Sequence, residues 1–394
     1  MAREYKRISA DSHIEYPPDL WSKRVDAKYR DLAPKRVQLP DGGDGFIAEG
    51  GIYRGGSNLY ASRDPSISKD DYSPLGLVWE DMAGTGDGAQ RVRELDQDGI
   101  DAEVGFPGNG GVRNICRGIR NDDAYNALTQ AYNEWLVEDF CSVAPDRLIG
   151  VGCIPDRGLD AAMAALEYCG KAGLKAVDLN GFPSAKSYPT LEDDRFWAAI
   201  VDMDMPLNVH TSFGATSARG PMFKYPIEPP ADARPPDYVE RLARYGIRSA
   251  RNAVQLVMGG VFDRFPTLKV HWAESQIGWL PIYLEQMDHN YKRHHRWAEK
   301  IYGIKPLKRL PSETIKEHMY WGFFDDPIGI KMRYEIGVDR IMWGGDFPHI
   351  ESDWPDSDVL LKRAFADVPD DEAHMMVAGN AVEFFHLQEL SPDR

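Results

Sequence analysis

The chain is poor in cysteine and has no long apolar run. Its 394 residues include four cysteines, with no Cys-x-x-Cys pair and none of the density of a disulfide framework. No stretch approaches the roughly 18 consecutive apolar residues of a membrane span. The first residues, Met-Ala-Arg-Glu-Tyr-Lys-Arg, contain no apolar segment of a secretory signal. We therefore expect a cytoplasmic protein with reduced thiols and no membrane association.

Basic residues are also too few and too scattered for a nucleic-acid-binding surface. The chain has 46 Lys and Arg against 62 Asp and Glu, a formal net charge of −16, and no basic run. Neither nucleic acid nor an anionic membrane is therefore an expected partner. Hydrophobic residues make up 43% of the chain and aromatic residues 11%. This composition supports a large globular core and excludes disordered and fibrous classes.

Strand-like and helix-like segments alternate along most of the chain. Short apolar runs rich in β-branched residues are followed by segments with helical periodicity, which is typical of a parallel sheet with helical crossovers. Eight strand candidates end near Glu15, Phe106, Ile154, Leu179, His210, His271, Phe324 and Asp346. Eight such units predict an α/β protein with the (β/α)8 TIM-barrel fold.

We expect residues 1–394 to form a single barrel domain with two insertions. The stretches at about 34–80 and 213–238 interrupt the alternation and are rich in glycine, proline and polar residues. The final part, at about 357–385, reads as two closing helices. Loops of this length are usually functional, so we expect substrate specificity to reside in the two insertions.

Four of the strand candidates end in residues that can bind a metal ion. The run Asp-Ser-His-Ile-Glu at 11–15 places His13 and Glu15 two residues apart, and therefore on one face of a strand. The other three runs end at His210, His271 and Asp346. The carboxyl ends of parallel strands meet at one rim of a barrel. Joint placement of these side chains predicts one metal centre assembled from the whole chain.

Four motifs in this order resemble the amidohydrolase superfamily. They are Asp-Ser-His-Ile-Glu at 11–15, Asn-Val-His at 208–210, Val-His-Trp-Ala-Glu-Ser at 270–275 and Trp-Gly-Gly-Asp-Phe-Pro-His at 343–349. The resemblance is to the branch that contains aminocarboxymuconate-semialdehyde decarboxylase and related aromatic-acid decarboxylases, and it extends from about residue 5 to residue 385. It implies a metal-dependent lyase or hydrolase, with nonoxidative decarboxylation of a small carboxylic acid as the leading reaction.

The resemblance also implies roles for individual residues. His13, Glu15, His210 and Asp346 would be the metal ligands, and Asp346 would also accept a proton. His271 corresponds to a histidine that acts as an acid or base beside the metal-bound water or substrate. The sequence departs from the family in one respect, because His-x-Glu replaces His-x-His on the first strand. Related decarboxylases carry a Glu and a His there in the reverse order.

Three further residues follow from position. Glu274 lies three residues after His271, and His349 lies three residues after Asp346, so each could contact the substrate or orient a ligand. Asp11 precedes the first-strand pair and could do the same. Carboxylate ligands suit Mn(II) or Fe(II) beside Zn(II). We therefore expect a divalent metal, with one or two ions per chain.

Two alternatives remain open at this point. If His271 turns to bind as well, a site for two ions becomes possible, and a redox-active pair would permit oxygen chemistry. The chain would then be a dinuclear Fe- or Mn-dependent oxygenase on the same fold. The chain could instead be a noncatalytic partner subunit of such an enzyme, so that a related chain is its partner. In the leading interpretation it acts alone on a small carboxylic acid, as a homodimer or higher oligomer.

Overall fold

Eight parallel strands form one sheet in the computed structural model, which describes residues 3–49, 51–54, 59–64, 66–108, 112, 115–213 and 246–387. Their order follows the chain, β1-β5-β6-β7-β8-β9-β10-β11, and every neighbouring pair is parallel. The strands are β1 (Ile8–Ile14), β5 (Ala102–Pro107), β6 (Leu148–Ile154), β7 (Ala176–Leu179), β8 (Leu207–His210), β9 (Val270–Ala273), β10 (Met319–Phe323) and β11 (Ile341–Trp343). The main-chain N–H of Asp346 donates to the Asp11 oxygen at 2.8 Å and joins the last strand to the first. The predicted TIM barrel is confirmed.

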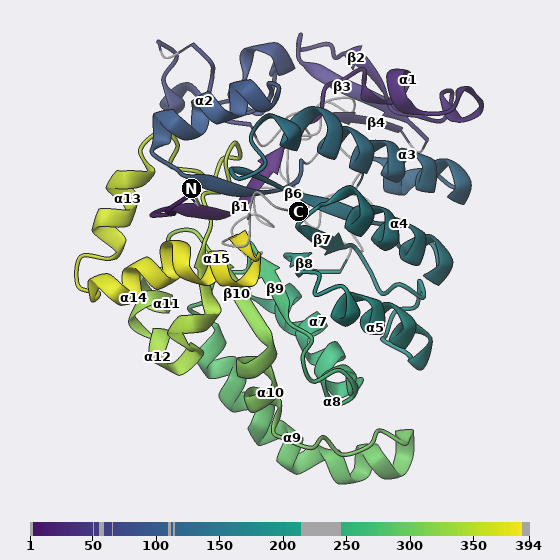
Figure 1. Ribbon diagram of the computed structural model, residues 1–394, viewed down its shortest axis with the longest axis vertical. Coiled ribbons are helices and arrows are strands. Elements are labelled where there is room, and N and C mark those ends of the chain that lie inside the picture. The colour runs from purple at the N-terminus through teal and green to yellow at the C-terminus, as the bar shows by residue number, and fades with distance from the viewer. Residues whose placement is uncertain are drawn as a thin grey trace, which may run out of the picture.

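Helices surround the strands on the outside (Figure 1). They are α1 (Leu20–Arg24), α2 (Gly88–Asp98), α3 (Asp122–Trp135), α4 (Leu159–Ala172), α5 (Asp194–Asp202), α7 (Ile247–Met258), α8 (Val261–Arg264), α9 (Leu280–Tyr302), α10 (Pro311–His318), α11 (Pro327–Lys331), α12 (Arg333–Ile336), α13 (Ser357–Ala364), α14 (Asp370–His374) and α15 (Asn380–Phe384). A π-helical segment, Met375–Gly379, joins α14 to α15. The far end of α9 extends away from the barrel, at the bottom of Figure 1.

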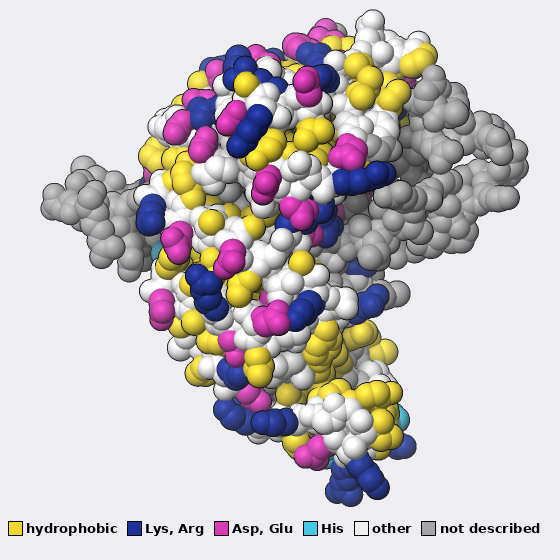
Figure 2. All heavy atoms as spheres, turned by 90° about the vertical axis from the view of Figure 1, so that its right-hand side faces the viewer, with side chains coloured by type: hydrophobic (Ala, Val, Ile, Leu, Met, Phe, Trp, Pro, Cys, Tyr) yellow, Lys and Arg dark blue, Asp and Glu magenta, His cyan; other side chains and the backbone are white. Residues whose placement is uncertain are grey.

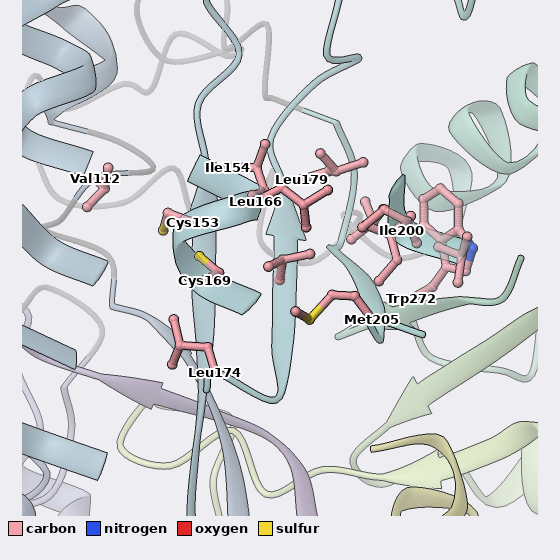
Figure 3. Packing of buried hydrophobic residues seen from close by; sticks show 14 of the residues in the cluster. Val112, Cys153, Ile154, Leu166, Cys169, Leu174, Leu179, Ile200, Met205 and Trp272 are labelled. Carbon is pink, nitrogen blue, oxygen red and sulfur yellow. The ribbon is translucent and has the colours of Figure 1, made fainter. Parts of the chain in front are cut away.

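The core lies in two layers because the strands are buried on both faces. The outer layer fills the space between strands and helices, where Cys153 of β6 lies beside Leu166 and Cys169 of α4 (Figure 3). The inner layer fills the barrel with residues such as Val104 and Met342. All four cysteines are free, as expected for thiols that serve as core residues.

The first insertion forms a small antiparallel sheet beside the barrel. It contains β2 (Lys35–Gln38), β3 (Asp44–Ala48) and β4 (Gly51–Arg54). Further along, Leu59 forms an isolated antiparallel bridge with His349, so this insertion contacts the C-terminal rim. The second predicted insertion, 213–238, lies outside the described residues except for Phe213.

The surface carries charges of both signs. On the face shown in Figure 2, basic and acidic side chains are interspersed over the coloured part of the molecule. Within the residues that the structure describes, no helix is long and apolar enough to cross a membrane.

Candidate metal centre

Carboxylate and imidazole side chains converge at the C-terminal rim of the barrel. Four buried residues, Asp11, His13, His210 and Glu274, each offer one ligand atom, and these atoms all lie within 4.8 Å of one another. A second group shares His13 with the first and adds two more buried residues, Asp346 and His349. The rim therefore holds a compact set of nitrogen and oxygen donors.

Strand β1 provides Asp11 and His13. They are two residues apart, so both side chains point into the barrel. The His13 Nδ1 atom lies 3.4 Å from the main-chain oxygen of Pro107. When Nδ1 carries the proton, the Nε2 atom presents a lone pair to the group. That Nε2 atom lies 3.0 Å from His210 Nε2 and 3.1 Å from Asp346 Oδ1.

Strand β8 provides His210 at its last position. The Asp178 carboxylate on the neighbouring strand β7 accepts the His210 main-chain N–H at 3.2 Å, which fixes the strand end. The Nε2 atom of His210 lies 3.4 Å from Asp11 Oδ1 and 3.1 Å from Glu274 Oε2. The ring centroid of Phe106 is 5.1 Å from that of His210, so an aromatic wall borders the donors.

Asp346 follows β11 after two glycines and adopts a left-handed conformation with φ of 51°. A Cβ atom at Gly344 would lie 2.5 Å from Asp11 Cβ, so only glycine allows the two segments to approach. The Oδ1 atom of Asp346 lies 3.1 Å from His13 Nε2 and 3.2 Å from His349 Nδ1. Its Oδ2 atom has no hydrogen-bond partner among the described residues.

His349 stacks on His13, with ring centroids 3.8 Å apart. Burial disfavours the charged imidazole, but the carboxylates of Asp346 and Glu15 outweigh it and raise the pKa of His349 to about 9. Burial likewise disfavours the charged form of Asp346, but His349 and His13 hold its pKa well below the usual range. The pair therefore favours a charged carboxylate beside a charged imidazole at neutral pH.

The donor set fits a divalent metal ion. The carboxylates and imidazoles of both groups are buried and close together, and Asp346 Oδ2 has no hydrogen-bond partner among the described residues. Mixed imidazole and carboxylate donors suit Mn(II), Fe(II) and Zn(II). Both groups include His13, whose Nε2 atom has one lone pair and binds one ion at a time. The number of ions per chain stays a prediction.

The structure brings together three of the predicted ligands, His13, His210 and Asp346, but places Glu15 elsewhere. Strand β1 ends at Ile14, and the Oε1 atom of the next residue, Glu15, lies 3.6 Å from His349 Nε2 and in neither group. Asp11 stands in its place beside His13. The spacing of two residues applies equally to Asp11 and His13, so the sequence already contained this signal.

His271 is not part of either group. In the register of β8 and β9 it pairs with Asn208, and His210 pairs with Ala273. His271 therefore lies two residues below the rim, where its Nδ1 atom is 2.9 Å from Asn208 Oδ1. Burial lowers its pKa to about 3, so the imidazole is neutral. Glu274, just after the end of β9, occupies the rim position that sequence reasoning gave to His271.

Comparison with known proteins gives consistent matches. A family model described as amidohydrolase matches residues 10–387. The chain is 28% identical to gamma-resorcylate decarboxylase from Polaromonas sp. over 273 residues, which cover 66% of this chain and 76% of that relative.

Solved structures match over nearly the whole chain. An amidohydrolase from Mycobacterium avium subsp. paratuberculosis superposes with a TM-score of 0.74 at 17% identity, over 99% of this chain and 100% of that one. A dihydroxybenzoic acid decarboxylase from Polaromonas sp., solved with bound manganese and the inhibitor 2-nitroresorcinol, superposes with a TM-score of 0.60 at 20% identity over 98% of each chain. At these identities the structural matches support the fold.

Proposed function

Because the chain belongs to the amidohydrolase family, we propose that it is a metal-dependent enzyme that removes carbon dioxide from a small aromatic carboxylic acid without oxidation. The observation that carries the proposal is the buried donor group at the rim of the barrel. The names of two relatives, gamma-resorcylate decarboxylase and dihydroxybenzoic acid decarboxylase, support the reaction and the substrate class.

The ion would be held by Asp11, His13, His210 and Asp346. Manganese is the first candidate, because carboxylate donors favour harder ions and a structural neighbour contains manganese. When bound, the ion acts as a Lewis acid that orients and polarises an oxygen of the substrate. We expect Glu274 and His349, which lie beside these four residues, to contact the substrate.

We expect Asp346 to take part in the proton transfer of the reaction. In decarboxylation of an aromatic acid, the bond between the ring carbon and the carboxylate breaks, carbon dioxide leaves, and a proton takes its place on the ring carbon. The Oδ1 atom of Asp346 lies 3.2 Å from His349 Nδ1, and its Oδ2 atom has no partner among the described residues. We propose that the charged imidazole of His349 is the source of this proton, and that the Asp346 carboxylate accepts it through Oδ1 before it passes to the ring carbon.

A small pocket lies beside the site. This pocket, between the barrel and the first insertion, adjoins Glu15, and its walls include Tyr16, Phe46, Leu59 and Trp79. Arg36 and Asp44 also line this pocket, and none of the four proposed ligands does. Its space suits a single water molecule and is too small for an aromatic ring.

The test is turnover without oxygen. Protein purified with Mn(II) and incubated anaerobically with 2,6-dihydroxybenzoate and related hydroxybenzoates should release carbon dioxide, lose this activity with a chelator and regain it with Mn(II). Metal-loaded protein that decarboxylates none of these acids would contradict the proposal and leave hydrolysis, the related reaction of the family.

The same assay separates the alternatives. The dinuclear oxygenase requires two ions per chain and oxygen uptake coupled to the substrate, and the relatives do not favour it. Turnover by the purified chain alone would exclude a noncatalytic subunit. The homodimer or higher oligomer stays a prediction, which light scattering of the purified protein checks.

A further inference from the structure

A buried arginine outside the donor group holds the backbone of the strand that carries two of the proposed ligands. Arg91 lies near the start of α2 and is 1% exposed. Its Nη2 atom donates to the main-chain oxygens of His13 at 2.5 Å and Gly84 at 3.2 Å. Its Nη1 atom donates to Glu103 Oε2 on β5 at 2.9 Å. Arg91 thus connects α2 and β5 to the metal-binding end of β1.

The main-chain oxygen of His13 depends on this donor. The N–H of His13 donates to the Phe347 oxygen at 2.7 Å, so at this level β1 is bonded to the segment that follows β11. That segment offers no N–H in return, because Pro348 has none and His349 donates its own to the Asp346 oxygen at 2.8 Å. A buried carbonyl without a donor is costly, and the Arg91 guanidinium supplies the bond.

Arg91 also contacts the segment that carries Asp346. Its guanidinium carbon lies 4.8 Å from the ring centroid of Phe347, the residue immediately after Asp346. The Gly84 loop packs on the next residue, because a Cβ atom at Gly84 would lie 2.4 Å from Pro348 Cβ. One side chain therefore contacts both segments that bring ligands to the rim from β1 and β11.

The charge of Arg91 is balanced locally. Glu103 Oε2 lies 2.9 Å from Nη1, and Glu94 Oε2 lies 3.9 Å from Nε, with both carboxylates buried. The positive charge of the guanidinium is therefore balanced by Glu103 and Glu94. Its planar, forked group holds several hydrogen-bond acceptors in fixed directions. A lysine has one compact ammonium and cannot reproduce that fork.

We propose that Arg91 is a positioning residue of the metal centre. By fixing the main chain of His13 and the ring of Phe347, it sets the directions of the His13 and Asp346 side chains, and so determines the affinity and ligand geometry of the site. It touches neither the ion nor the substrate. The inference rests on the metal centre of the proposed function and is independent of the reaction that the centre performs.

The experiment compares Arg91→Met and Arg91→Lys with a matched control, Arg147→Met. Arg147 is also buried, and its Nε and Nη2 atoms donate to the main-chain oxygens of Asp101 and Ile100 at 2.8 and 3.0 Å, just before β5 begins. Arg147 therefore also bonds main-chain oxygens next to a barrel strand, but at the end of the barrel opposite to the metal centre. The measurements are the Mn(II) dissociation constant by calorimetry, the visible absorption of the Co(II)-loaded protein, and the melting temperature of the metal-free protein.

Arg91→Met should raise the Mn(II) dissociation constant about 10- to 100-fold, the usual effect of removing a group that orients ligands, and should change the Co(II) spectrum. Arg91→Lys should have an intermediate effect, because one ammonium can replace only part of the fork. Arg147→Met should lower the melting temperature and leave both metal readouts unchanged.

The inference would be overturned if Arg91→Met bound Mn(II) as tightly as the wild type. It would also be overturned if Arg147→Met lost as much Mn(II) affinity as Arg91→Met. If Arg91→Met does not fold, Arg91→Lys decides by the same measurement. Wild-type protein that binds no Mn(II) would overturn the metal centre and this inference together. Wild-type binding with unaffected Arg91 variants would overturn the inference alone.

Discussion

The Asp11 carboxylate reaches both imidazoles of the centre, with its Oδ1 atom 3.4 Å from His210 Nε2 and 3.8 Å from His13 Nε2. Glu15, two residues beyond His13, contacts His349 instead. The carboxylate ligand near the end of the first strand is therefore either Asp11 or Glu15.

Asp11→Asn should weaken Mn(II) binding by about tenfold or more, because the amide loses the negative charge at the centre of the donor group. Glu15→Gln is the matched variant and should retain the ion, since its carboxylate lies outside both groups. The manganese content of each variant after dialysis tests both expectations. Loss of the ion in Glu15→Gln with retention in Asp11→Asn would reverse the assignment.

Gly344→Ala should displace Asp11, because the new Cβ atom would lie 2.5 Å from Asp11 Cβ. We expect a loss of roughly 1–3 kcal/mol in the free energy of unfolding, as for other overpacked sites, together with weaker Mn(II) binding. The neighbouring Gly345→Ala is the control, because its Cβ atom would meet nothing nearer than Ser9 Oγ at 3.4 Å. Urea unfolding compares the two variants, and equal effects would contradict the steric argument.

Glu274→Gln should reduce turnover strongly, because its carboxylate lies 3.1 Å from His210 Nε2 at the rim. His271→Asn should reduce stability and leave turnover per folded, metal-loaded molecule nearly unchanged, since His271 lies below the donors and bonds to Asn208. Steady-state kinetics on metal-loaded protein separates these outcomes. Abolished turnover in fully loaded His271→Asn would restore the acid or base role predicted for it from the sequence.

The metal-free protein should lose stability as the pH falls below about 6.5. Burial lowers the pKa of His271 to about 3 and that of His318 to about 4. Between these values and 6.5 the unfolded chain binds more protons than the folded one, so acid favours unfolding. Each histidine contributes up to about 1.4 kcal/mol per pH unit in this window.

Urea unfolding of the metal-free protein between pH 5 and pH 7 measures that slope. His318→Asn should flatten it, whatever the variant does to stability at pH 7. A slope unchanged by this substitution would show that other groups titrate in the window.

Much of the fold and part of the site could be predicted from the sequence. The alternation of apolar runs and helical periodicity is local information, and it was sufficient for the barrel and, with the four motifs, for the family, which the family match confirms. Parallel strands carry their last residues to one rim, so His13, His210 and Asp346 could be grouped without a structure.

The register between neighbouring strands could not be predicted from local sequence patterns. The run Leu-Lys-Val-His suggested a strand ending at His271, but β9 continues to Ala273, which is level with His210. The rim residue is therefore Glu274. Likewise, spacing places Asp11, His13 and Glu15 on one face of β1 but does not reveal at which of them the rim lies.

The bridge between Leu59 and His349 joins the first insertion to the centre through the main chain. Leu59 lines the pocket, while the imidazole of His349 lies beside His13 and Asp346 at the rim. Substitutions at this crossing can therefore reshape the pocket without replacing a donor. The first insertion can therefore vary in sequence while the donor side chains at the barrel rim stay the same.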